Sequence, residues 1–231
     1  MKTIGIIGGI GPESTIDYYR SMVAEYRRAH ANTGYPAIVI NSVDLDRLRQ
    51  YFDAGNLDAV TDYLLIELQR LADAGADFAM LAANTPHIVF DRLQQASPVP
   101  LLSIVQATCD YARAAGVTRA GLLGTRFTMQ AEFYPRVFSK AGLPIVVPTA
   151  AEQDFIHEKY FDELVNGVFL PETREALLAI IERMKAQDRI DGIILGGTEL
   201  PLILGDSTVE GVAFLDTTKI HVKAALAAAE L

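Results

Sequence analysis

Cysteine, basic residues and long apolar runs are scarce in this 231-residue chain, and each shortage excludes a class of protein. The one cysteine, Cys109, rules out an internal disulfide and a metal site built from several thiolates. Lys and Arg number 20 against 29 Asp and Glu, so the net charge of −9 argues against a protein that grips a nucleic-acid backbone. No apolar run approaches the roughly 20 residues that cross a bilayer.

The opening residues show no secretion signal. Met1-Lys2-Thr3-Ile4-Gly5 leads into glycines and a proline, whereas a signal peptide continues with an apolar stretch and a cleavage site. Apolar residues make up 50% of the chain and charged residues 21%, which is typical of a packed globular protein. We expect a soluble cytoplasmic protein with neither nucleic-acid nor membrane partners.

Short apolar runs alternate with helical patterns along the whole chain. Regular alternation of this kind predicts an α/β fold in which helices cover both faces of parallel sheets. Eight runs have the length and composition of buried parallel strands: Ile4–Ile7, Ala37–Ile40, Phe78–Ala82, Leu101–Ile104, Ala120–Leu123, Ile145–Val147, Gly192–Leu195 and Val212–Leu215.

Three of the helical patterns give specific expectations. The stretch Leu57–Ala74 is predicted to end at Gly75, and Thr217 is predicted to cap a final helix that runs to Leu231. In the first helix, the apolar residues recur at three- and four-residue steps, which places them on one face. They are Ile16, Tyr19, Met22, Val23 and Tyr26.

The chain also resembles itself. Gly5-Ile-Ile-Gly8 and Gly121-Leu-Leu-Gly124 are 116 residues apart, and Asp77 and Asp191 precede two further strands at a spacing of 114. This internal similarity predicts two similar parallel-sheet α/β lobes related by a pseudo-twofold axis. The alternative is coincidence, because any α/β protein repeats strand–glycine–helix units.

We expect the first lobe to comprise residues 1–103 together with 212–231, and the second to comprise residues 104–211. Ligands of open parallel sheets bind beyond the carboxyl ends of the strands. Two facing lobes would therefore surround one cleft with their strand-end turns.

The first of these turns, Gly8–Thr15, is rich in glycine. Its glycines allow a sharp turn, Pro12 is preset for a first helical turn, and the helix N-terminus offers N–H groups to an anion. A dinucleotide site requires a third glycine where Ser14 stands. The turn therefore favours a small carboxylate-sized anion over a nucleotide.

Five motifs in order along the chain resemble those of the aspartate/glutamate racemase family. Each is weak alone, but their order and their places at strand ends make the set specific. The motifs are Gly8-Gly9-x-Gly11-Pro12, Asn84-Thr85-x-His87, Leu123-Gly124-Thr125-x-x-Thr128 followed by Tyr134, Thr198-Glu199-Leu200-Pro201, and Asp216-Thr217.

The resemblance implies a cofactor-independent, dimeric racemase that binds an acidic amino acid between its lobes. Such enzymes invert the α-carbon with two cysteines, one on each face, and a thiolate is a usable base for this purpose. In this chain the two cysteine positions of the family fall on Ala83 and Gly197. Neither residue has a titratable group that could accept or donate a proton, so the two-thiol mechanism cannot operate here.

Two titratable residues stand near the missing thiols, His87 in the first catalytic loop and Glu199 in the second. Either is a candidate proton carrier if its pKa is suitable, and the alternative is that both only shape their turns. Cys109 lies in an apparent helix among alanines, where a lone cysteine is usually a small buried hydrophobe.

Substrate binding is expected from residues that offer N–H groups, hydroxyls or positive charge to a carboxylate. His30, His157 and His221 show no metal-ligand spacing, so we expect no metal site. The expected substrate-binding residues are Gly11, Pro12, Arg47, Asn84, Thr85, Thr125, Thr128, Lys159 and Thr198.

The leading interpretation is an amino-acid racemase, or a related isomerase, that transfers the α-proton of a small amino or carboxylic acid without any cofactor. No lysine stands in a recognisable context for pyridoxal phosphate. Two alternatives stay open: a non-catalytic binder of small carboxylates, and another carbanion chemistry such as decarboxylation, which needs fewer bases. A homodimer is expected from the family resemblance.

Overall fold

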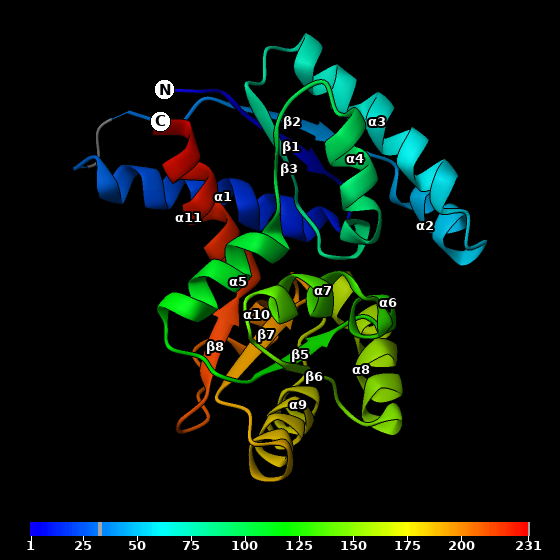
Figure 1. The fold of residues 1–231 in the computed structure, drawn as a ribbon, viewed down its shortest axis with the longest axis vertical. Helices are drawn as coiled ribbons and strands as arrows, with labels where there is room; N and C mark the ends of the chain where they lie inside the picture. Colours follow the sequence, from blue (N-terminus) through cyan, green and yellow to red (C-terminus); the bar gives the residue numbers. More distant parts are fainter. Residues whose placement is uncertain (32–33, 231) are drawn as a thin grey trace. The chain divides into compact units, whose positions relative to one another are not determined.

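The computed structural model describes residues 1–31 and 34–230, which form two compact units (Figure 1). One unit takes Met1–Ile104 and the chain from His221 onwards, and the other takes Val105–Ile220. The chain therefore passes into the second unit at about the predicted place and returns to the first later than predicted.

The first unit contains a four-stranded sheet in which every pair of neighbours is parallel. The strand order is β2-β1-β3-β4, so β1 and β3 occupy the centre. Both central strands are fully buried, as their unbroken apolar sequences require. The strands are β1 (Ile4–Gly8), β2 (Ile38–Ser42), β3 (Phe78–Leu81) and β4 (Leu101–Leu102).

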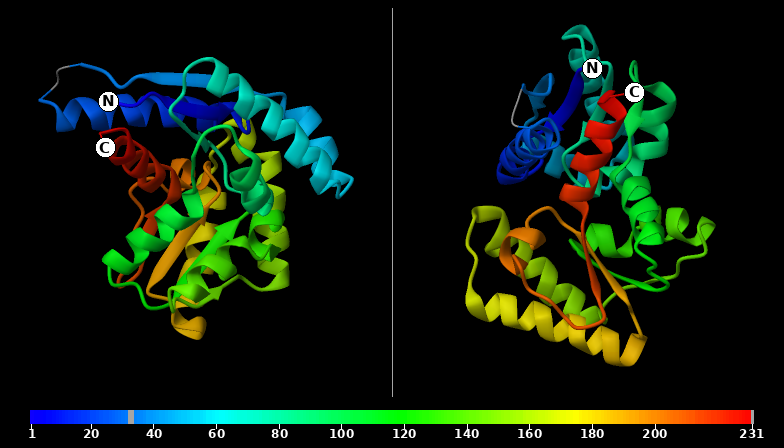
Figure 2. Two further views of the ribbon diagram at one scale, coloured as in Figure 1. Left: turned by 45° about the horizontal axis from the view of Figure 1, so that its top comes forward. Right: turned by 90° about the vertical axis from the view of Figure 1, so that its left-hand side faces the viewer.

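Helices pack on both faces of this sheet. One face, with Ile4 and Met80, packs against α1 and α11; the other, with Ile7 and Leu81, packs against α3 and α4. Figure 2 shows α1 and α11 side by side, and the Lys2 N–H donates to the Ala229 carbonyl at 2.8 Å. The helices are α1 (Pro12–Ala29), α2 (Leu45–Asp53), α3 (Leu57–Asp73), α4 (Phe90–Ala96) and α11 (Thr217–Glu230), with a 3₁₀ turn η1 at Thr85–Val89.

The buried face of α1 differs from the expected apolar stripe. Ser14, Tyr18 and Met22 are buried, whereas Ile16 and Tyr19 are 47% and 51% exposed. The helix is oriented by polar anchors, because the Ser14 hydroxyl donates to the Ala82 carbonyl at 2.8 Å and the Tyr18 hydroxyl lies 3.0 Å from His221 Nδ1. Apolar periodicity alone could not indicate these anchors.

The second unit repeats the topology of the first. Its sheet is also fully parallel, in the order β6-β5-β7-β8. The strands are β5 (Ala120–Gly124), β6 (Ile145–Val146), β7 (Gly192–Gly196) and β8 (Ala213–Asp216). The helices are α5 (Ile104–Ala114), α6 (Arg126–Gln130), α7 (Phe133–Lys140), α8 (Ala150–Asp162), α9 (Pro171–Arg183) and α10 (Leu200–Leu204), with short turns η2 (Leu164–Asn166) and η3 (Met184–Asp188).

The matching strand orders confirm the predicted fold class of two similar parallel-sheet α/β lobes. All eight predicted strands are present. The strand β8 pairs with β7, so Ile194 lies opposite Leu215 and this segment belongs to the second sheet. The expected lobe boundary at residue 212 is corrected to residue 220, because a ladder of hydrogen bonds fixes β8 before α11 enters the first unit.

The predicted helix ends are confirmed at α3 and corrected at α11. Helix α3 ends at Asp73, and Gly75 adopts a φ of +86°, as expected of a glycine after a helix. At α11 the carboxylate of Asp216 accepts the Lys219 N–H at 3.0 Å, whereas Thr217 is already helical and donates to the Leu195 carbonyl. The predicted end at Leu231 lies outside the described residues.

Within residues 1–31 and 34–230, no helix combines the length and the apolar character that a membrane crossing requires.

Candidate functional site

The glycine-rich turn after β1 depends on two glycines in the left-handed region. Gly9 and Gly11 have φ values of +79° and +78°, and a Cβ on Gly9 would collide with the Val43 carbonyl oxygen. The Gly9 N–H donates to the Thr15 hydroxyl at 2.8 Å, and Pro12 begins α1. The structure thus places Gly11 and Pro12 at the N-terminus of an 18-residue helix, as predicted from the sequence.

The turn after β3 lies beside this glycine turn. The Ser14 hydroxyl, from the first turn of α1, holds the Ala82 carbonyl at 2.8 Å. Ala83 and Asn84 are buried and Thr85 is half-buried, at the point where η1 begins. The first unit therefore gathers both of its predicted site turns at the carboxyl ends of its two central strands.

His87 lies beneath this turn and is 1% exposed. Its Nε2 accepts the Ile104 N–H at 3.3 Å, and its ring stacks on Phe90 with centroids 4.8 Å apart. Burial lowers the pKa of His87 to about 4, although backbone groups of Asn84 and Ala83 oppose the change. The imidazole is therefore neutral at neutral pH and packed within its own unit.

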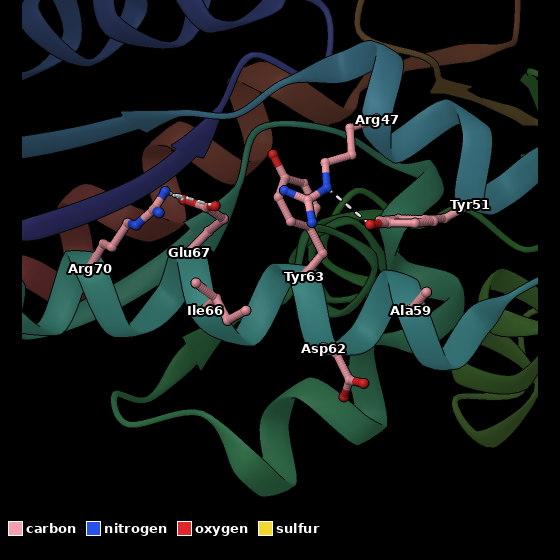
Figure 3. Close-up of a pocket in the computed structure, with 8 residues that line it drawn as sticks. All are labelled: Arg47, Tyr51, Ala59, Asp62, Tyr63, Ile66, Glu67 and Arg70. Carbon is pink, nitrogen blue, oxygen red and sulfur yellow. Dashed lines mark hydrogen bonds and ion pairs between the residues drawn. The ribbon is translucent and has the colours of Figure 1, made fainter.

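Arg47 lines a groove of about 340 Å³ on the first unit (Figure 3). Its Nε donates to the Tyr51 hydroxyl at 2.9 Å, and its guanidinium lies 4.9 Å from the Tyr63 ring centroid. The groove is built by α2 and α3, and its other lining residues are Ala59, Asp62, Ile66, Glu67 and Arg70. An arginine stacked on aromatic rings in this way keeps a defined position while remaining charged.

The second unit builds an equivalent pair of turns. A Cβ on Gly124 would lie 2.8 Å from the Gly196 carbonyl oxygen, so β5 and β7 end at glycines in close approach. Thr125 caps α6 by accepting the Thr128 N–H at 3.3 Å, and the two hydroxyls lie 3.2 Å apart. Both threonines are buried at the end of β5, where the sequence predicted a ligand turn.

The turn after β7 carries a buried acidic group. Glu199 is 2% exposed, and its Oε2 accepts hydrogen bonds from the Thr198 hydroxyl at 2.9 Å and from the Tyr160 hydroxyl. Tyr160 comes from α8 and was missed by the sequence reasoning. Only its position next to Lys159, a predicted site residue, pointed toward this turn.

Gly197 has no room for a side chain because Tyr160 occupies the space. A Cβ on Gly197 would lie 2.5 Å from Tyr160 Cε2 and 2.8 Å from the Tyr160 hydroxyl oxygen. Real Cβ atoms essentially never approach other atoms below 3.0 Å. The aromatic ring of α8 thus fills the volume that a side chain at position 197 would take.

Lys159, the second predicted cation, is held within the second unit. Its Nζ lies 2.5 Å from Glu163 Oε1, and Glu163 also accepts the Thr173 hydroxyl at 2.6 Å. The hydrogen bond to Glu163 raises the pKa of Lys159. The lysine is therefore firmly charged and already paired.

Cys109 is buried in α5, as predicted, and desolvation raises the pKa of its thiol. A thiol in such a setting is a packing group rather than a nucleophile. Among residues 1–31 and 34–230, no three His, Cys, Asp or Glu side chains are arranged to hold a metal ion.

These features define a class of protein: a duplicated parallel α/β chain whose central strands end in glycine- and threonine-rich turns suited to a small anion. The Asp/Glu/Hydantoin racemase family model matches residues 7–225, and the chain belongs to this family. The predicted family resemblance is thereby confirmed.

Individual relatives agree with this assignment. The broad specificity amino-acid racemase RacX of Bacillus subtilis is 27% identical over 176 residues, which cover 71% of this chain and 67% of RacX. An Asp/Glu racemase candidate from Yersinia pestis superposes with a TM-score of 0.91 at 32% identity, and an aspartate racemase homologue from Pyrococcus horikoshii with 0.86 at 35%. Both structural matches cover 100% of each chain.

Proposed function

We propose that this chain binds a small amino or carboxylic acid, of the size of aspartate or glutamate, in a cleft between its lobes. The four turns that would contact the acid follow β1, β3, β5 and β7, the two central strands of each sheet. Carboxyl ends of central parallel strands are the usual ligand sites of such sheets. The turns are Gly8–Ser14, Asn84–Thr85, Thr125–Thr128 and Thr198–Glu199.

Carboxylates of the acid are assigned to N–H groups and hydroxyls of these turns. The N-terminus of α1 offers N–H groups at Gly11 and beyond, and threonine hydroxyls complete the cradle. Arg47 and Lys159 are the cations proposed to face the acid. Lys159 would exchange Glu163 for a substrate carboxylate, whereas Arg47 is already exposed at its groove.

The proposed activity on aspartate and glutamate is α-proton transfer without efficient racemisation. The two cysteine positions of the family carry this proposal. Ala83 has no titratable side chain. At position 197 the space for a side chain is filled by Tyr160. Loss of one positioned base typically costs about 10²–10⁴-fold in rate. Inversion requires a proton carrier on each face, so this chain would racemise slowly or not at all.

Of the two titratable candidates, Glu199 is the better placed for proton transfer. In the turn after β7, its carboxyl oxygen accepts buried hydrogen bonds from the hydroxyls of Tyr160 and Thr198. His87 is neutral and buried beneath the first turn, which favours the role of orienting Asn84 and Thr85.

Titration calorimetry with the enantiomers of aspartate and glutamate, paired with chiral chromatography of the same mixtures, tests the proposal. We expect measurable affinity for at least one acid and inversion about 10²-fold or more below that of a two-thiol racemase assayed in parallel. Asn84→Ala should weaken binding, whereas the matched control Asn56→Ala, which removes the cap of α3, should lower stability only. Efficient inversion, or no affinity for any of these acids, would refute the proposed function.

A further inference from the structure

In the second unit, the side chain of Tyr160 occupies the space beside Gly197. The Tyr160 hydroxyl oxygen lies 2.8 Å from the point where a Cβ on Gly197 would stand. The family resemblance places a proton carrier at this position. The phenol of Tyr160 therefore brings an O–H group to the place from which that carrier is missing.

The Tyr160 hydroxyl is connected to a base. Tyr160 is 6% exposed and donates its hydrogen bond to Glu199 Oε2, which also accepts the Thr198 hydroxyl at 2.9 Å. Both hydroxyls therefore meet at one carboxyl oxygen of Glu199, which is the acceptor of this network. Burial, followed by the nearby charge of Glu199, raises the pKa of Tyr160 well above its ordinary value, so the phenol keeps its proton at neutral pH.

We propose that Tyr160 and Glu199 form a proton relay that exchanges the α-proton of the bound acid on one face only. This inference rests on the proposed function, since it requires an acid bound at the four turns. The Cα–H bond breaks, the electron pair stays on the acid, and its proton passes to the Tyr160 oxygen. The proton that Tyr160 carried passes to Glu199, and the reverse steps return a solvent-exchanged proton to the same face.

Among the described residues of the first unit, none forms an equivalent relay at position 83. Ala83 presents only a methyl group, and the His87 imidazole is engaged by the Ile104 N–H and by stacking on Phe90. A carbanion formed by the relay would therefore be reprotonated from the side it was deprotonated on. Exchange with retention of configuration is the signature of this arrangement.

The full chain is tested in D₂O with each enantiomer of aspartate and glutamate. Proton NMR follows loss of the α-proton signal, and chiral chromatography follows inversion. We expect one enantiomer to take up deuterium with inversion at least tenfold slower than exchange. Tyr160→Phe, which keeps the ring, and Glu199→Gln, which keeps the shape, should each lower exchange by about 10²-fold or more. Affinity measured by calorimetry should change much less.

Tyr134→Phe is the matched control, because it removes another buried phenol hydroxyl of the second unit, one bonded to Thr108. It should leave exchange unchanged. The relay is overturned if exchange persists in Tyr160→Phe, if inversion keeps pace with exchange, or if a bound acid shows no exchange at all. Absence of binding in calorimetry would instead refute the proposed function on which the relay rests.

Discussion

At the scale of single residues, the turn after β7 requires a glycine at position 197. The ring of Tyr160 occupies the space that a side chain at this position would need. Tyr160 reaches the turn from α8, 37 positions away from Gly197 in the sequence. Glycine at position 197 therefore removes the proton-carrying side chain of the family and also satisfies the packing of Tyr160. The two residues should behave as a coupled pair in stability measurements.

Gly197→Ala should destabilise the protein by about 1–3 kcal/mol, because the added methyl group overlaps the Tyr160 ring. In a Tyr160→Ala background the same change should cost much less, since the space is then open. Urea denaturation of the four proteins in this cycle measures the coupling. Equal costs of Gly197→Ala in both backgrounds would show that the ring does not occupy this volume.

Cys109→Ser should lower stability by about 1–3 kcal/mol, because a hydroxyl replaces a thiol at a buried position of α5. Affinity for the acid should be unchanged, since the thiol is a packing group. Denaturant melts give the first quantity and calorimetry the second. A loss of binding at unchanged stability would place Cys109 in the site.

At the scale of elements, an aspartate before one central strand of each sheet accepts backbone N–H groups from the segment that leads into the other central strand. Asp77 accepts the Thr3 N–H at 2.6 Å before β3, and Asp191 accepts the Thr118 and Arg119 N–H groups before β7. Burial alone would raise the pKa of Asp191, but these hydrogen bonds outweigh it and lower the pKa. The two halves thus share a polar contact as well as a strand order.

Asp191→Asn should destabilise the second unit by about 1–3 kcal/mol, since an amide cannot accept all of the hydrogen bonds at Asp191. The contribution of Asp191 is present above its unfolded-state pKa and is lost as the pH falls through the lower folded-state pKa. Denaturation at pH 7 and at about pH 3 measures it. A cost that is the same at both pH values would contradict this assignment.

Elements were largely predictable from the sequence, and their orientations were not. The apolar runs identified all eight strands, because a buried parallel strand needs a continuous apolar sequence. The buried face of α1 could not be predicted, since Ser14 and Tyr18 face inward to make hydrogen bonds. Tyr160 was also missed, because its role depends on a contact between α8 and the turn after β7 rather than on sequence spacing.

At the scale of the whole molecule, two buried histidines link stability to pH. Burial lowers the pKa of His87 to about 4 and that of His221 to about 3, and at His221 the charge of a protonated His87 adds to the lowering. Both imidazoles are neutral in the folded protein, whereas the unfolded chain protonates them near pH 6.5. Their contribution to stability is therefore present above pH 6.5 and is lost as the pH falls toward 4 for His87 and toward 3 for His221.

Between about pH 6.5 and 5, the free energy of unfolding should fall by up to about 1.4 kcal/mol per pH unit for each of these histidines. Replacement of either histidine by glutamine should remove that residue's contribution to the slope of unfolding free energy against pH. Urea denaturation across this interval tests the expectation, and His30→Gln, at a partly exposed position, is the control. A wild-type stability that is flat over this range would contradict neutral burial of both rings.

A crystal structure of the full chain grown with aspartate or glutamate tests the central claim most directly. We predict that the acid lies among the four turns, with a carboxylate within about 3.2 Å of donors at Gly11, Thr85, Thr125 or Thr198. Its α-carbon should face the Tyr160 hydroxyl. An acid that contacts none of these four turns, or contacts confined to the turns of one unit, would contradict the account.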